Sequence, residues 1–183
     1  MQALTGFYFT DDQRGMDPLI VADKLPPGTG IIFRHYKSKN RPETAYYLSK
    51  ICKRRKIMLH IAQDPSLAKA VKAGGLHLPE YQIPRLPLIR HRYPGLKIST
   101  ACHSARSLTL ASSLGADMAF LSPVFVTDSH PGKVSLGTMR AALVKQNVPL
   151  PVYALGGVHK QNLPQLQALK FSGFGAISFF ENE

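Results

Sequence analysis

Short, almost wholly apolar runs recur along the chain, and most are followed by a segment with the period of an amphipathic helix. Continuous apolar runs are typical of strands that are covered on both faces, whereas half-exposed strands alternate apolar and polar residues. The pattern therefore predicts a parallel sheet with helical connections. The eight expected strands are residues 6–10, 30–36, 56–62, 75–78, 97–100, 118–122, 152–155 and 175–178.

Residues that favour helix ends lie between several of these strands. Asp64-Pro65 has the pattern of an N-cap followed by proline at the first helical position. A later helix is expected to begin at Ser135, with Met139, Ala142 and Leu143 together on one face. These connections are long enough to join parallel strands.

Eight strands that alternate with helical segments favour a (βα)₈ TIM barrel, formed by one domain over residues 1–183. The chain is short for that fold, which typically takes about 250 residues. Only residues 179–183 follow the last expected strand, so we expect the eighth helix to be missing or reduced to a turn. An open doubly wound sheet is the alternative architecture.

The composition adds a strong positive charge to an otherwise ordinary globular chain. Lys and Arg total 23 against 11 Asp and Glu, a net charge of +12. Such an excess attracts phosphate esters, pyrophosphate or nucleic acid. The densest run, Lys53-Arg54-Arg55-Lys56, is expected to be a solvated helix end. No recognised nucleic-acid motif accompanies the charge, so nucleic acid is an unfavoured partner.

Long apolar segments and cysteine motifs are missing from the sequence. No run is long enough to span a bilayer and no signal peptide opens the chain, so we expect a cytoplasmic protein with no membrane partner. Cys52 and Cys102 form neither a disulfide framework nor a Cys-x-x-Cys pair.

A pair of glycines directly after the seventh strand is the clearest candidate for ligand binding. Ligands of β/α barrels bind at the carboxyl ends of the strands, and phosphate commonly lies at the loops after strands seven and eight. Gly156 and Gly157 allow backbone N–H groups to approach an anion without a Cβ in the way. Ser178, at the end of the eighth strand, adds a hydroxyl. The alternative is a tight strand exit with a structural role only.

A second polar cluster follows the sixth strand. Its hydroxyls and histidine are the donors that phosphate or carboxylate oxygens need, and it includes Ser122, Thr127, Ser129 and His130. A solvated surface loop would have the same composition. Other candidates for contacting a substrate lie at further strand ends, namely Arg34, Lys37, His77 and His103.

An ordered set of short motifs from about Ile61 to Ser178 resembles the thiamine phosphate synthase and TenI family of barrels. The motifs are Gly75-Leu76-His77-Leu78, Ala101-Cys102-His103-Ser104, Leu114-Gly115-Ala116-Asp117, Ser122-Pro123-Val124-Phe125, Ala154-Leu155-Gly156-Gly157-Val158 and Gly175-Ala176-Ile177-Ser178. The resemblance implies that Gly156, Gly157 and Ser178 hold a thiazole phosphate. It also implies that the loop with Thr127 and Ser129 contacts the substrates.

The acidic residues that hold Mg²⁺ in the synthase are changed in this chain. The resemblance places one at Ala62-Gln63-Asp64, where only the last acid remains, and Asp64 is explained by its N-cap position. It places the other at Pro79-Glu80-Tyr81-Gln82, where glutamine stands for aspartate. Neutral amides are poor ligands for a pyrophosphate-bound Mg²⁺, so no metal is expected. Arg34 and Lys37 are then expected to meet the ligand directly.

The resemblance leaves three functions open. The first is an enzyme of thiamine biosynthesis, either a transferase or a TenI-type tautomerase, with His103 or His130 in proton transfer, because Pro123 stands where the tautomerases have histidine. The second is an inactive relative that binds a phosphorylated heterocycle as a sensor or carrier. The third is a basic nucleic-acid-binding domain. The family also includes assemblies, so a homo-oligomer is compatible with the resemblance.

Overall fold

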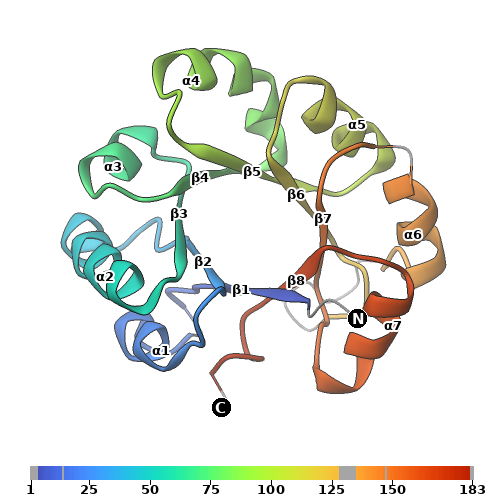
Figure 1. Cartoon of the computed structure of the whole chain (residues 1–183), viewed down its shortest axis with the longest axis horizontal. Coiled ribbons are helices and arrows are strands. Elements are labelled where there is room, and N and C mark those ends of the chain that lie inside the picture. The colour runs from blue at the N-terminus through green and yellow to red at the C-terminus, as the bar shows by residue number, and fades with distance from the viewer. Residues whose placement is uncertain (1–3, 14, 128–134, 147, 182–183) are drawn as a thin grey trace.

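A computed structural model describes residues 4–13, 15–127, 135–146 and 148–181, and it contains a closed barrel of parallel strands (Figure 1). Each strand pairs with the next one along the chain, and β8 pairs with β1. The strands are β1 (Thr5–Phe9), β2 (Gly30–Phe33), β3 (Met58–Ala62), β4 (Gly75–Leu78), β5 (Lys97–Cys102), β6 (Met118–Leu121), β7 (Val152–Leu155) and β8 (Gly173–Ala176). The predicted barrel is confirmed, and the open doubly wound sheet is wrong.

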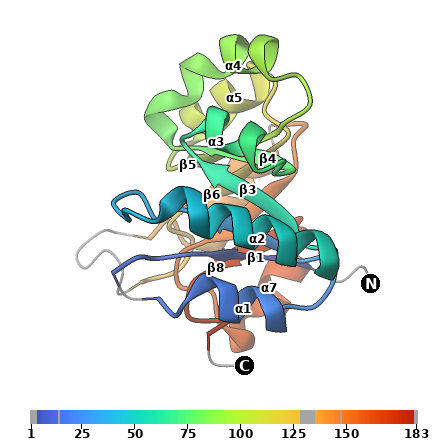
Figure 2. The same cartoon turned by 90° about the vertical axis from the view of Figure 1, so that its left-hand side faces the viewer.

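The helices form a ring outside the strands, as the views along the barrel axis and from the side show (Figures 1 and 2). They are α1 (Pro18–Lys24), α2 (Arg41–Arg55), α3 (Pro65–Ala70), α4 (Leu86–Arg92), α5 (Ala105–Ser113), α6 (Thr138–Gln146) and α7 (Leu163–Ala168). Two 3₁₀ helices, η1 (Glu80–Arg85) and η2 (Lys160–Asn162), precede α4 and α7. After β8, residues 177–181 form turns, so within the described chain the expected reduction of the eighth helix is confirmed.

Two strands end at least two residues earlier than the apolar pattern predicts. β2 ends at Phe33 and β8 ends at Ala176, so Arg34 and Ser178 lie in the loops beyond the strands. β8 begins at Gly173, which pairs with both Thr5 and Tyr153. A Cβ at Gly173 would collide with the carbonyl oxygen of Thr5, so glycine is needed for this close approach. Arg34 and Ser178 consequently lie at the end of the barrel where ligands bind in this fold.

Aromatic side chains fill the interior of the barrel. Phe7, Phe9, Phe120 and Tyr153 pack mainly edge to face, with ring centroids 4.9–5.2 Å apart. This interior cluster lies apart from the larger core between strands and helices. The barrel is consequently packed along its axis, and a ligand can enter only at the loops.

Two buried histidines share one hydroxyl inside the same barrel. The Nδ1 atoms of His60 on β3 and His77 on β4 each lie 3.0 Å from Ser99 Oγ. Burial lowers the pKa of His60 to about 4 and that of His77 to about 3, so both rings are neutral at pH 7. The hydroxyl of Ser99 also lies 3.3 Å from the carbonyl oxygen of Leu76.

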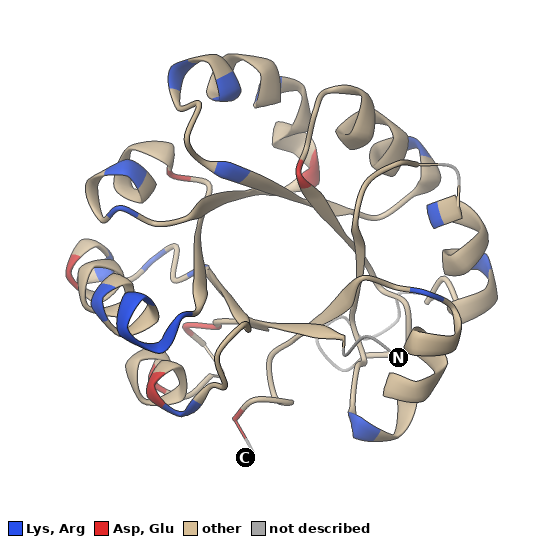
Figure 3. Cartoon of the chain, viewed as in Figure 1, with Lys and Arg blue, Asp and Glu red and all other residues tan. Residues whose placement is uncertain are grey.

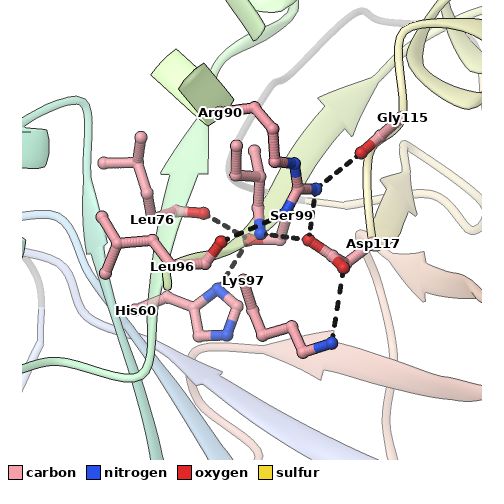
Figure 4. A network of polar contacts seen from close by, with 9 residues as sticks. His60, Leu76, Arg90, Leu96, Lys97, Ser99, Gly115 and Asp117 are labelled. Atoms are coloured by element: carbon pink, nitrogen blue, oxygen red, sulfur yellow. Dashed lines mark hydrogen bonds and ion pairs between the residues drawn. The ribbon is translucent and has the colours of Figure 1, made fainter. Parts of the chain in front are cut away.

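A charged network closes the amino ends of β5 and β6 (Figure 4). Asp117 accepts hydrogen bonds from Arg90 Nη2 and from the N–H of Ile98, each at 2.7 Å, and lies 3.5 Å from Lys97 Nζ. Burial acts to raise the pKa of Asp117, but the bonds from Ile98 and Arg90 hold it below its usual value. In β/α barrels this end supports stability rather than ligand binding.

The helix ends confirm one sequence prediction and correct another. Asp64 caps α3, with its Oδ1 2.9 Å from the N–H of Leu67. However, α6 begins at Thr138 rather than Ser135, and Met139 and Leu143 are 69% and 60% exposed. Ala142, expected on the same face, is buried as predicted, and Ala141 is buried beside it, because small side chains let this helix approach the barrel.

The cations lie around the outer helices rather than on one face (Figure 3). At the end of α2, Arg54 pairs with Asp23 at 2.7 Å and Arg55 donates to the carbonyl oxygen of Leu25 at 3.0 Å. These side chains are therefore already engaged with neighbouring protein groups. No helix of the described residues is long and apolar enough to cross a membrane.

Candidate functional site

A cavity of about 380 Å³ lies where the carboxyl ends of several strands meet. The loops after β6, β7 and β8 form most of its wall, and Arg34 and His103 complete it from β2 and β5. Among the residues proposed from sequence, the structure brings together Arg34, His103, Ser122, Thr127, Gly156, Gly157 and Ser178.

Both glycines of the β7 loop have backbone conformations that disfavour other residues. Gly156 has φ of 92° and Gly157 has φ of 67°. A Cβ on Gly156 would lie 3.0 Å from two atoms of Pro123, and one on Gly157 would collide with the carbonyl oxygen of Val126. The glycines therefore allow the loops after β6 and β7 to pack against each other, which shapes this corner of the cavity.

The carbonyl groups of the β7 loop are all held by donors from the protein. The donors are backbone N–H groups of the β6 loop and one side-chain amide. The bonds are Val124 N–H to Leu155 O at 2.9 Å, Phe125 N–H to Gly156 O at 3.1 Å and Asn162 Nδ2 to Gly157 O at 2.9 Å. The backbone of this loop is consequently fixed in orientation.

Several N–H groups at the same corner are free. Within the described residues, the N–H groups of Gly157, Val158 and Ser178 donate to no backbone or side-chain acceptor. All three residues line the cavity. Unpaired backbone donors beside a cavity are a common means of binding anions, because each N–H supplies a fixed partial positive charge.

Arg34 supplies a full positive charge from β2. Its Nε donates to the carbonyl oxygen of Thr10 at 2.7 Å, and its guanidinium lies 5.6 Å from the ring centroid of Phe9. Its Nη2 lies 3.5 Å from Asp11 Oδ2. Because the side chain is still 28% exposed, part of the guanidinium is accessible to a ligand. Arg34 is thus held in position to attract an anionic ligand in the cavity.

His103 and Ser122 contact each other on the wall beneath the β6 loop. His103 Nδ1 lies 2.9 Å from the carbonyl oxygen of Ser122 and 3.2 Å from its Oγ. An Nδ1–H that donates to this carbonyl leaves Nε2 as the proton acceptor of the neutral ring. The N–H of His103 donates to Glu80 Oε2 at 2.6 Å, which fixes the backbone of the histidine.

Two proposed residues lie outside this cavity. His77 is 4% exposed in the barrel interior, where its ring packs against Phe9 and Phe120. Lys37 lies beside a separate cavity of about 490 Å³, and its N–H is 3.4 Å from Asp12 Oδ2. The structure therefore does not bring these two residues to the glycine loop. Ser129 and His130 lie outside the described residues.

The residues at the ends of β3 and β4 are occupied by contacts within the protein. Arg41 donates from Nη2 to the carbonyl oxygen of Ala62 at 2.6 Å and from Nη1 to Asp64 at 3.4 Å. The other oxygen of Asp64 caps α3. With Glu80 bonded to the backbone of His103, both acids in this region already have protein partners.

Two further residues, His159 and Asn162, lie beside the glycine loop, and sequence reasoning missed the second of them. His159 lines the cavity, and its Nδ1 lies 2.8 Å from Gln161 Oε1. Asn162 is buried next to it and bonds to the loop. A signal for Asn162 was its spacing three residues after His159, since asparagine in that position can complete a capping box.

Comparison with known proteins assigns the chain to a family. The family model described as thiamine monophosphate synthase matches residues 13–180. The chain belongs to this family. The resemblance inferred from the ordered motifs is therefore confirmed, and with it the assignment to thiamine biosynthesis proteins of the synthase and TenI type.

The chain aligns with different fractions of the length of its curated relatives. A putative thiamine-phosphate synthase 2 from Aquifex aeolicus is 34% identical over 130 residues, which are 71% of this chain and 69% of the relative. A thiamine-phosphate synthase from Vibrio campbellii is 27% identical over 97% of this chain and 90% of its own length. Other curated relatives are longer, and the chain spans less than half of them.

A solved structure supports the fold. The thiamine phosphate pyrophosphorylase from Pyrococcus furiosus superposes with a TM-score of 0.82 at 22% identity. The match covers 96% of this chain and 86% of that protein. At this identity the likeness establishes the barrel fold alone.

Proposed function

We propose that the chain binds a thiazole phosphate or a similar phosphorylated heterocycle, with the phosphate group at Gly156, Gly157 and Ser178. The observation that carries this proposal is that the N–H groups of Gly157, Val158 and Ser178, beside the cavity, have no acceptor among the residues that the structure describes. A phosphate group has enough acceptor oxygens to satisfy all three donors at once. The cavity volume of about 380 Å³ suits a small ligand.

The remaining wall supports a role for charge and proton transfer. Arg34 supplies the counter-charge to the anionic ligand. His103 accepts a proton at Nε2 and returns it, while the carbonyl oxygen of Ser122 keeps the other ring nitrogen protonated. This is the chemistry that a tautomerase requires, and it is also available to a transferase that must remove a proton.

The residues present do not fit the Mg²⁺ ion that the family resemblance implies. Asp64 and Glu80 already accept hydrogen bonds from protein donors, and Gln63 and Gln82 offer only neutral amide oxygens. In the described part of the chain, no group of three or more His, Cys, Asp or Glu side chains can hold a metal ion. In this proposal the ligand charge is therefore met by arginine and not by Mg²⁺.

The same contacts favour a second candidate, a relative that binds the phosphorylated heterocycle without transferring it. Asp64, which lies 3.4 Å from Arg41, and Glu80, which accepts from the N–H of His103, are both occupied by protein donors, and this reduces the means of holding a metal ion against a pyrophosphate leaving group. A nucleic-acid-binding role has no comparable support, because the cations are distributed around the outside of the barrel (Figure 3).

Calorimetric titration with hydroxyethylthiazole phosphate tests the binding proposal. We expect saturable binding of the phosphate and none of the unphosphorylated thiazole alcohol, since the contacts are with the phosphate oxygens. Equal affinity for the two compounds, or none for either, would refute the proposal. Formation of thiamine phosphate from this ligand and a pyrimidine pyrophosphate, measured with Mg²⁺ and with EDTA, then separates the transferase from the binding protein. Turnover that depends on Mg²⁺ would show that the metal argument is wrong.

A further inference from the structure

Asn162 is a buried polar residue that does not line the cavity but holds its wall. The residue ends η2 and is 8% exposed. Its Nδ2 donates to the carbonyl oxygen of Gly157 at 2.9 Å, and its Oδ1 accepts from the N–H of His159 at 3.0 Å. One side chain therefore bridges the two ends of the segment Gly157–His159.

The bond to Gly157 has a direct consequence for the next residue. The carbonyl of Gly157 and the N–H of Val158 belong to the same peptide plane, and in a trans peptide they point in opposite directions. By holding this carbonyl on its own side, Asn162 turns the N–H of Val158 the other way. That N–H has no acceptor within the described chain, and Val158 lines the cavity.

The neighbouring peptide planes are fixed in the same manner. The carbonyl of Gly156 accepts from the N–H of Phe125, which orients the N–H of Gly157. These bonds come from the β6 loop, whereas the bond to Gly157 comes from a side chain. The orientation of the Val158 donor is thus the part of the corner that a single substitution can release.

We propose that Asn162 is a positioning residue of the phosphate corner. It aims the N–H of Val158 at the phosphate oxygens and holds His159 in the cavity wall, without touching the ligand itself. This inference rests on the proposed phosphate binding at Gly156, Gly157 and Ser178. It adds to that proposal a residue whose substitution raises the Kd for the ligand through the orientation of the loop and not through loss of stability.

Substitution of Asn162, with a matched control in the next helix, tests the inference. The control is Leu163→Ala, which removes a partly buried side chain from α7 but leaves the loop bonds in place. We expect Asn162→Ala to raise the Kd for hydroxyethylthiazole phosphate about tenfold, because a free carbonyl lets the peptide turn away. Leu163→Ala should lower Tm while its Kd stays within about twofold of the unchanged chain.

The variant Asn162→Asp tests the same role through pH, because its side chain can donate a hydrogen bond only when it is protonated. At pH 7 its carboxylate can accept from His159 but cannot donate to Gly157, so affinity falls. A carboxyl buried against a carbonyl protonates more readily than an exposed one, and the acid form can donate again. Relative to the unchanged chain at each pH, the Kd of Asn162→Asp should therefore recover at pH 5.

The outcomes separate this inference from the function on which it rests. If the unchanged chain does not bind the phosphate, the proposed function fails. If it binds, and Asn162→Ala binds within twofold as tightly, the positioning role is refuted. Equal loss of affinity in Leu163→Ala would also refute it, since general destabilisation would then explain the effect. If Asn162→Ala does not fold, the pH dependence of Asn162→Asp decides, and the absence of recovery at pH 5 counts against the role.

Discussion

The buried pair His60 and His77 should make the stability of the barrel depend on pH. Burial lowers the pKa of His60 to about 4 and that of His77 to about 3, against 6.5 for the unburied side chain. Both rings contact Ser99 Oγ, and His77 is also affected by its neighbours His60 and Arg34. Figure 4 shows His60 directed at this hydroxyl. The folded state therefore favours the neutral form of both rings.

The direction of the effect follows from proton uptake. Below pH 6.5 the unfolded chain protonates these histidines while the folded chain does not, so stability is lost as pH falls from about 6.5 toward the folded pKa. Above pH 6.5 the two states bind equal numbers of protons and the effect disappears. At pH 5 each histidine costs about 2 kcal/mol relative to pH 7, or about 4 kcal/mol for the pair.

The assay is urea unfolding followed by circular dichroism at pH 7 and pH 5. His77→Gln keeps a polar partner for Ser99 but cannot protonate, so its loss of unfolding free energy between the two pH values should be smaller by about 2 kcal/mol. His91→Gln, at an exposed position on α4, is the matched control and should behave as the unchanged chain. If His77→Gln loses as much stability as the control, the buried pair does not carry the pH dependence.

Four further predictions concern the site and the thiols. Gly157→Ala should lose about 1–2 kcal/mol of stability and bind no phosphate ligand in calorimetry, because φ is 67° and its Cβ meets Val126. Arg34→Gln should weaken that binding about tenfold, whereas Arg54→Gln, of equal charge change, should not. Replacing Mg²⁺ by EDTA should leave the Kd within about twofold. Cys52 and Cys102, whose pKa values burial raises to about 12 and about 11, should react with Ellman's reagent at pH 8 only after unfolding.

The barrel was predictable because its strands are apolar on both faces. Continuous runs such as those of β4 and β7 have the bounds that the sequence pattern predicts. β8 was placed two residues late, because Gly173 and Gly175 interrupt its apolar pattern. These glycines are needed where another backbone or ring approaches closely, and such contacts across the barrel are invisible in a local window. The packed face of α6 was predicted only in part, since Ala142 is buried as expected whereas the larger Met139 and Leu143 are exposed.

The sequence predicts those candidate site residues whose location at the cavity depends on their position in the fold alone. Gly156, Gly157 and Arg34 line the cavity because the carboxyl ends of parallel strands converge there. His77 has a comparable position in sequence, yet its side chain points into the barrel, since successive strand residues alternate between the interior and the helices. Asn162 was not predicted, because its role depends on a bond to a loop whose shape only the structure shows.

Two regions at the carboxyl ends of the strands, the glycine corner and the ends of β3 and β4, differ in the groups that they offer to a ligand. The glycine corner offers backbone N–H groups, whose identity does not depend on side chains and which persist while the loop keeps its shape. The ends of β3 and β4 depend on side chains, and there Asp64 and Glu80 are occupied by protein donors. The proposed binding of a phosphate group at the glycine corner therefore does not depend on the side chains that would stabilise a leaving group. Binding and turnover must be measured separately in this chain, because the first can be intact where the second is altered.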